Sequence, residues 1–251
     1  MPNKNIKYNS KKLLEFFSFN RQKWDEFYPS ERWVFDKIGG KDKKLGDVLD
    51  VGCACGGLGA ALDERFILAS YTGVDVHRGA IDWARRHQKL SIPSYFITGD
   101  ILEVDLNNRY DIVVSLSCAD WNIEAEKIIN TCWEKVDKDG YFVISLRLTA
   151  LEGINNIKES YQYINPSGKE KDPEIANYVV FNFKEIVSII KGFSPSPELI
   201  GAYGYWGKPA TTAVTPFDKL VFAVFYIKKP ALVSNTKIST EFNLPEEMNG
   251  K

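Results

Sequence analysis

The stretch that decides the fold is Val48-Leu49-Asp50-Val51-Gly52-Cys53-Ala54-Cys55-Gly56-Gly57. An apolar run ends there in an acidic residue, and a loop of glycine, alanine and cysteine follows at once. A buried strand that stops at a turn of small residues lets a ligand approach bare backbone, and the helix expected next points its N-terminal N–H groups at that ligand. Asp50 favours a ligand with a positive charge or a free amine, because a carboxylate at this position repels a pyrophosphate.

Strands and helices alternate after this loop. Strand 47–51 is followed by predicted strands at 71–75, 95–97, 111–116 and 141–148, and by predicted helices at 57–66, 79–90 and 122–136. Repeated strand–helix units predict an α/β fold with a mostly parallel sheet and helices on both faces. Two more strands are expected over 198–203 and 220–227, after the regular alternation ends.

The composition is that of an ordinary globular protein, with 251 residues, 44% hydrophobic and 26% charged. A net charge of −1 gives no basic field, which argues against a nucleic-acid partner. No apolar stretch approaches the ~20 residues that span a bilayer. The N-terminus has no apolar signal core, and the four cysteines form neither a disulfide framework nor a metal knuckle, so a reduced, cytoplasmic protein is expected.

The chain divides into three predicted parts. Aromatic residues at helical spacing indicate a helical cap over 1–45, before the sheet. The main domain is expected over 46–229, with polar, loop-like inserts at 150–180 and 203–218 that cap a pocket. Residues 230–251 lack periodicity and are expected to form a flexible tail.

Three acidic residues follow three predicted strands in order: Asp50, then Asp75 and then Asp100, each 25 residues after the last. They stand in the motifs Asp50-Val51-Gly52-Cys53-Ala54-Cys55-Gly56, Gly73-Val74-Asp75-Val76 and Gly99-Asp100-Ile101. This layout resembles the class I S-adenosylmethionine-dependent methyltransferases over about residues 46–150, and elsewhere only by topology. Ala54 departs from the family's middle glycine. The resemblance implies a Rossmann-like sheet of seven strands, the last antiparallel.

The resemblance also implies S-adenosylmethionine as cofactor. Asp75 would accept both ribose hydroxyls, Asp100 would accept from the adenine amine, and Asp50 would meet the amino group directly or through water. Apolar side chains would enclose the adenine ring, and the glycines would let the methionine moiety come close. The cofactor-binding residues implied are Asp50, Gly52, Ala54, Gly56, Asp75, Val76, Asp100, Ile101 and Ser115.

Two other interpretations come from different classes. Gly52-x-Ala54-x-x-Gly57 loosely fits a dinucleotide fingerprint, which would indicate an oxidoreductase. Asp50 would then face a pyrophosphate, and no Tyr-x-x-x-Lys dyad follows strand five. A protein that binds S-adenosylmethionine without catalysis is the other alternative.

Candidate catalytic residues are His77 and Asp120. His77 follows Asp75 and is either a general base or part of a helix start. Asp120, just after strand four, either orients the nucleophile or caps the helix expected at 122–136. Methyl transfer from a sulfonium depends mostly on proximity, alignment and exclusion of water.

Substrate-binding candidates lie farther along the chain. Trp121 follows Asp120 and either lines the acceptor site or packs in the core. Arg147 is a charge in a central strand and needs a partner, either a substrate anion or an internal acid. Tyr205 and Trp206 offer stacking faces. No metal is expected, because strand five ends without a carboxylate–amide cluster. We expect O-methylation of a small polar acceptor such as a sugar or an anion; N-methylation of a small amine is the alternative.

Overall fold

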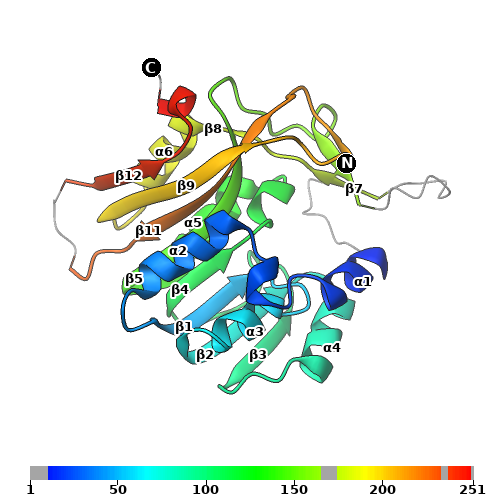
Figure 1. The fold of residues 1–251 in the computed structure, drawn as a ribbon, viewed down its shortest axis with the longest axis vertical. Helices are drawn as coiled ribbons and strands as arrows, with labels where there is room; N and C mark the ends of the chain where they lie inside the picture. The colour runs from blue at the N-terminus through cyan, green and yellow to red at the C-terminus, as the bar shows by residue number, and fades with distance from the viewer. Residues whose placement is uncertain (1–10, 165–173, 233–236, 250–251) are drawn as a thin grey trace.

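The computed structural model describes residues 11–164, 174–232 and 237–249 (Figure 1). Within them, one sheet of nine strands has the order β12-β9-β11-β5-β4-β1-β2-β3, with β8 paired to β5. Its strands are β1 (Lys44–Val51), β2 (Ile67–Asp75), β3 (Ser94–Thr98), β4 (Tyr110–Ser115), β5 (Val136–Thr149), β8 (Phe181–Asn182), β9 (Leu199–Gly207), β11 (Leu220–Lys228) and β12 (Ser239–Asn243). A small sheet joins β6 (Tyr161–Tyr163), β7 (Ile175–Asn177) and β10 (Ala213–Val214) in the order β10-β6-β7.

The large sheet is mostly parallel. β1 pairs in parallel with β2 and β4, and β4 pairs in parallel with β5. β11 runs antiparallel to both β5 and β9, so one antiparallel strand lies between parallel neighbours. The predicted Rossmann-like α/β fold, with helices on both faces of a mostly parallel sheet, is confirmed. The prediction of seven strands with the last one antiparallel is wrong in detail: the described residues form nine strands in this sheet, and the antiparallel β11 is followed by β12, which is parallel to β9.

Helices cover both faces of the sheet. They are α1 (Lys11–Phe19), α2 (Pro29–Gly39), α3 (Gly57–Asp63), α4 (Arg78–His87), α5 (Ala125–Lys135) and α6 (Phe183–Lys191), with short 3₁₀ turns η1 (Trp24–Glu26), η2 (Ala119–Trp121) and η3 (Glu246–Asn249). α2, α3 and α4 pack on one face, against Val48, Val114 and Val143. α5 and α6 pack on the other (Figure 1).

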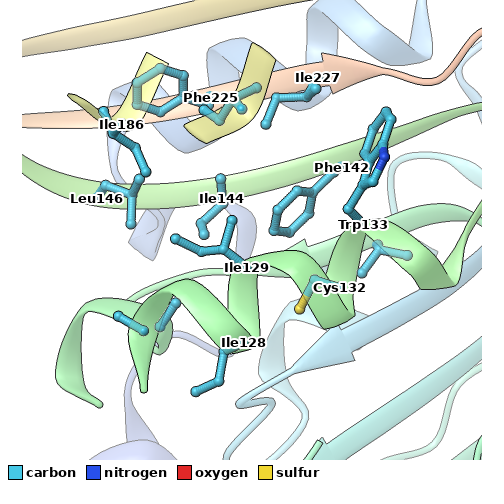
Figure 2. Packing of buried hydrophobic residues seen from close by; sticks show 14 of the residues in the cluster. Ile128, Ile129, Cys132, Trp133, Phe142, Ile144, Leu146, Ile186, Phe225 and Ile227 are labelled. Atoms are coloured by element: carbon cyan, nitrogen blue, oxygen red, sulfur yellow. The ribbon is translucent and has the colours of Figure 1, made fainter. Parts of the chain in front are cut away.

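The α5 face holds the larger core. Figure 2 shows Ile129 and Trp133 of α5 beside Phe142 and Ile144 of β5, with Phe225 of β11 above them in the view. Side chains on β5 alternate between the two cores, because successive residues of a strand point to opposite faces. Burial on both faces explains why the central parts of β1, β4 and β5 are mostly apolar.

Several predicted boundaries differ from the structure. The expected tail over 230–251 contains β12, which pairs in parallel with β9 and packs Phe242 on Phe183 of α6. A five-residue edge strand with only one partner carries too little periodicity to predict. The loop-like inserts contain β6, β7 and β10, and β9 extends through Gly207. Residues 1–10 of the predicted cap, 165–173 of the first insert, and 233–236 and 250–251 of the tail lie outside the described residues.

No helix among the described residues is both long and apolar enough to cross a membrane.

Candidate functional site

A cavity of about 410 Å³ lies where β1, β2, β3 and β4 end. Ligands of open α/β sheets bind at the carboxyl ends of the strands, so this is the expected position for a site. α1 and the segment after it supply one side of the cavity, through Leu13, Leu14, Phe17, Arg21 and Tyr28. Of the residues predicted from sequence, the lining includes Asp50, Gly52, Ala54, Asp75, Val76, His77, Asp100, Ile101 and Trp121.

The loop after β1 curves because three of its residues have left-handed backbone angles. Gly52, Ala54 and Gly56 have φ of 81°, 47° and 75°. A side chain on Gly52 would meet the sulfur of Cys118 at 2.5 Å, so glycine is required there by space as well as by angle. Ala54 adopts the left-handed angle despite its methyl group, which explains how the family's middle glycine can be replaced.

Asp75 links this loop to the start of α4. Its two carboxylate oxygens accept the backbone N–H of Ala54 at 2.9 Å and of His77 at 2.7 Å. Burial raises the pKa of Asp75, and these two N–H donors oppose the rise. The cavity therefore holds a carboxylate whose protein partners are neutral donors and whose position is fixed from both sides.

Asp50 is the second buried carboxylate of the cavity, only 3% exposed. Its Oδ2 accepts the hydroxyl of Tyr71 at 2.6 Å. Burial raises the pKa of Asp50 to about 7, and the Tyr71 hydrogen bond opposes that rise. Asp100 is the third carboxylate, and its Oδ1 accepts the backbone N–H of Leu102 at 3.0 Å.

Two of the predicted cofactor residues do not line the cavity. Gly56 is the residue before α3, where its positive φ starts the helix, and Gly57 lines the cavity next to it. Ser115 is fully buried at the end of β4, while Leu116 and Ser117 reach the cavity. Gly57, Leu116 and Ser117, which are next to them in the chain, line the cavity instead.

His77 begins α4 and lines the cavity, but its ring has a structural role. Its Nδ1 accepts the backbone N–H of Ala80 at 3.1 Å, which caps the helix. In a neutral imidazole with Nδ1 as acceptor, the proton lies on Nε2, which is then a donor. This geometry favours the helix-start interpretation over a general base.

Arg147 and Asp120 form a buried ion pair. Arg147 Nε lies 2.6 Å from Asp120 Oδ2, and its Nη2 donates to the Asp120 carbonyl at 2.6 Å. The guanidinium also stacks on Tyr178, 3.7 Å from the ring centre. Neither side chain lines the cavity. The central-strand charge has an internal partner, so the structure does not place Arg147 at a substrate or Asp120 at a nucleophile, and Asp120 does not cap α5.

Tyr205 and Trp206 also lie away from the cavity. They belong to β9 rather than to a loop. The Nζ of Lys219 lies over the Trp206 ring, 4.1 Å from its centre, and the Nε1 of Trp206 donates to Glu247 at 3.4 Å. The structure therefore does not place these two aromatic residues at a substrate.

The sequence analysis missed several lining residues. Asn20, Asn122 and Gln162 contribute amide groups from three separate segments. Arg21, with φ of 59°, makes a bidentate ion pair with Glu31, at 2.9 and 3.1 Å. No local pattern marks these residues, because each reaches the cavity only through tertiary packing.

The cysteines of the cavity are packing residues. Cys53, Cys55 and Cys118 line it, and burial raises the pKa of each thiol, that of Cys55 to about 12. A thiol that stays protonated at neutral pH is a poor nucleophile. These cysteines therefore serve as small, neutral side chains in a crowded part of the cavity wall.

Comparison with known proteins places the site in a family. Residues 48–140 match the model of a methyltransferase domain. A malonyl-[acyl-carrier protein] O-methyltransferase of Acetivibrio thermocellus is 30% identical over 141 residues, which are 54% of this chain and 49% of that protein. Ribosomal RNA small subunit methyltransferase C of Haemophilus ducreyi is 35% identical over 79 residues, 30% of this chain and 23% of that protein. The chain thus spans half or less of these relatives.

The fold has solved counterparts. The crystal structure of an S-adenosylmethionine-dependent methyltransferase from Clostridium acetobutylicum superposes with a TM-score of 0.53 at 14% identity, covering 85% of this chain and 94% of that one.

The charged side chains of the cavity suit S-adenosylmethionine. Asp50, Asp75 and Asp100 line one cavity, and the guanidinium of Arg21 beside them is already paired with Glu31. Such a surplus of carboxylates favours a ligand with a sulfonium and an ammonium group and disfavours a pyrophosphate. Residues 48–140 are therefore a methyltransferase domain of the class I, S-adenosylmethionine-dependent kind, and the chain has the fold of a solved S-adenosylmethionine-dependent methyltransferase.

Proposed function

We propose that the protein transfers a methyl group from S-adenosylmethionine to a hydroxyl of a small, neutral, polar acceptor. The single observation that carries this is the composition of the cavity, whose described lining residues combine three carboxylates, aromatic faces and amide groups with one arginine that is already paired. The bound cofactor supplies an activated methyl group on its sulfonium. Asp75 would hold the ribose, Asp100 the adenine amine and Asp50 the amino group.

The acceptor side of the cavity offers hydrogen-bond acceptors. The amide nitrogen of Asn20 donates to the Phe16 carbonyl, that of Asn122 to the Cys118 carbonyl, and that of Gln162 to Thr212 Oγ1, over 2.7 to 2.9 Å. Among the described residues, no donor reaches the three amide oxygens. Amide oxygens in this position can accept from a hydroxyl of the acceptor and fix its orientation.

Aromatic side chains form another part of the wall on the acceptor side of the cavity. Phe17, Tyr28 and Trp121 line the cavity with flat faces. Such faces suit a sugar ring or an aromatic alcohol. An anionic acceptor is disfavoured, because it would meet carboxylates and no unpaired cation among the described lining residues. The sequence analysis offered a substrate anion as one partner for Arg147. Arg147 is paired with Asp120, so it does not support an anionic acceptor.

Catalysis by this arrangement depends on position more than on a strong base. The geometry of His77 and the ion pair of Asp120 leave neither side chain placed to take a proton from the acceptor. Alignment of the hydroxyl and exclusion of water by α1 are the contributions that the described residues offer.

An amine is the second candidate acceptor. The same carboxylates that disfavour anions attract a protonated amine, and amide oxygens accept from N–H as readily as from O–H. The acceptor's nitrogen would have to lose a proton before transfer, which the cavity does not assist with a placed base.

The test is a transfer assay with S-adenosylmethionine carrying a labelled methyl group. Four acceptor pools are compared: neutral sugars and phenols, carboxylic acids, small amines, and fragments of ribosomal RNA. The proposal predicts label in the first pool, and none with the Asp75→Asn variant. Label confined to the amines would show that the acceptor is an amine and not a hydroxyl compound. Label confined to the acids or to the RNA would contradict the proposal.

A further inference from the structure

Tyr71 lies on β2 beneath the cavity and does not line it. The side chain is completely buried, and its hydroxyl donates to Asp50 Oδ2 at 2.6 Å. The ring is held between two elements: it lies 5.8 Å from Phe96 between ring centres, and a Cβ on Gly59 of α3 would lie 2.8 Å from its Cζ. The hydroxyl is therefore aimed at one carboxylate oxygen by packing that leaves it little freedom.

Asp50 lines the cavity, and only one of its two carboxylate oxygens has a hydrogen-bond partner among the described residues. Oδ2 is held by Tyr71, and no donor among the described residues reaches Oδ1. A carboxylate bound in this way has one oxygen for the protein and one for a ligand. The tyrosine thus fixes the direction in which the ligand-facing oxygen points.

Few charges act on this carboxylate. Asp75 on the neighbouring strand and Glu31 of α2 oppose its ionisation, while Arg21 after α1 favours it. Cys53 in the loop is a neutral thiol, because burial and nearby carboxylates raise its pKa. Burial is the largest influence and raises the pKa of Asp50 to about 7, and the Tyr71 hydroxyl acts against it.

We propose that Tyr71 is a positioning residue that holds Asp50 as an oriented anion for the amino group of the cofactor. The inference rests on the proposed use of Asp50 by the cofactor's amine. It adds that a buried hydroxyl outside the cavity sets the affinity for that amine, and that the affinity depends on pH near neutrality.

The test is calorimetric titration with S-adenosylhomocysteine from pH 6.0 to 8.5, comparing the unaltered protein with Tyr71→Phe. Affinity falls as the pH is lowered, and loss of the hydroxyl should raise the midpoint of this fall by about one pH unit. A hydrogen bond to a charged group changes the pKa of that group by about this amount. The expected loss of affinity is about tenfold at pH 6, about fivefold at pH 7 and less than twofold at pH 8.5.

A matched variant controls for the loss of a tyrosine hydroxyl in general. Tyr226 is equally buried, and its hydroxyl donates at 2.8 Å to Glu241, a carboxylate that does not line the cavity. Tyr226→Phe removes the same kind of bond and should leave the affinity at every pH within twofold of the unaltered protein.

A matched ligand separates positioning from packing. 5′-Methylthioadenosine carries the adenosine and the thioether without the amino-acid amine, so its affinity should be unchanged in Tyr71→Phe at every pH. An equal loss for both ligands, or a loss for S-adenosylhomocysteine that does not vary with pH, would overturn the inference. Failure of the unaltered protein to bind S-adenosylhomocysteine at pH 8.5 would instead overturn the proposed use of the site.

Discussion

The molecule contains two kinds of buried carboxylate, and the difference between them separates the site from the scaffold. The buried Asp50 and the partly buried Asp75 line the cavity, and their direct partners are a phenol hydroxyl and backbone N–H groups. Asp120 is equally buried outside the cavity, and its partner is the guanidinium of Arg147. A buried anion without a counter-ion of its own suits a cationic ligand, whereas one with a counter-ion stabilises the fold.

The largest effect should come from breaking the ion pair. Arg147→Ala would leave Asp120 buried and unpaired, and should lower the free energy of unfolding by about 3–5 kcal/mol in a urea titration. Arg65→Ala, which removes an exposed partner of Asp36, is the control and should change it by less than about 1 kcal/mol. A small effect of Arg147→Ala would mean that Asp120 is not held by this pair and would return it to the catalytic candidates.

Removing the charge of Asp50 should stabilise the protein, whereas breaking the Arg147–Asp120 pair should destabilise it. The pKa of Asp50 is about 7 in the folded protein and near 3.8 when exposed, so the folded state binds a proton between these values that the unfolded state has released. Stability is therefore lost as pH rises from about 4 to 7. Asp50→Asn should leave stability nearly unchanged at pH 4 and raise it by up to about 4 kcal/mol at pH 8, measured by urea unfolding without ligand. A gain that is the same at both pH values would contradict the unpaired-anion interpretation.

Asp75 tests the same comparison through binding. Asp75→Asn removes the charge that would accept the ribose hydroxyls, and should weaken S-adenosylhomocysteine about 100-fold in calorimetry. Asp111→Asn is the matched control, because Asp111 also accepts a backbone N–H, from Asp47 at 2.8 Å, but lies at the other end of the sheet. Equal losses in the two variants would show a structural rather than a ligand-binding role.

The acceptor side should give the smallest effect. Gln162→Leu removes one neutral hydrogen bond and should raise KM for an accepted hydroxyl compound about fivefold, with the affinity for S-adenosylhomocysteine unchanged. The measurement uses the acceptor found in the transfer assay. A change in cofactor affinity without a change in KM would move Gln162 to the cofactor side.

The carboxylates of the cavity, which we propose to hold the cofactor, were predictable because each lies at or just after the end of a strand. Asp50, Asp75 and Asp100 are placed by the order of strands, and that order is visible as alternating apolar runs in the sequence. The acceptor side was not, because Asn20, Asn122 and Gln162 are brought together by α1, by the segment after η2 and by the small sheet. Arg147 shows the same limit: its sequence position demanded a partner, but only the packing of η2 against β5 identifies it as Asp120.

The most direct test of the cavity's role is a side-by-side calorimetric titration of the unaltered protein with S-adenosylhomocysteine and with NAD. The arrangement of carboxylates predicts one S-adenosylhomocysteine bound per chain and no heat of binding with NAD. Binding of NAD without S-adenosylhomocysteine would contradict it.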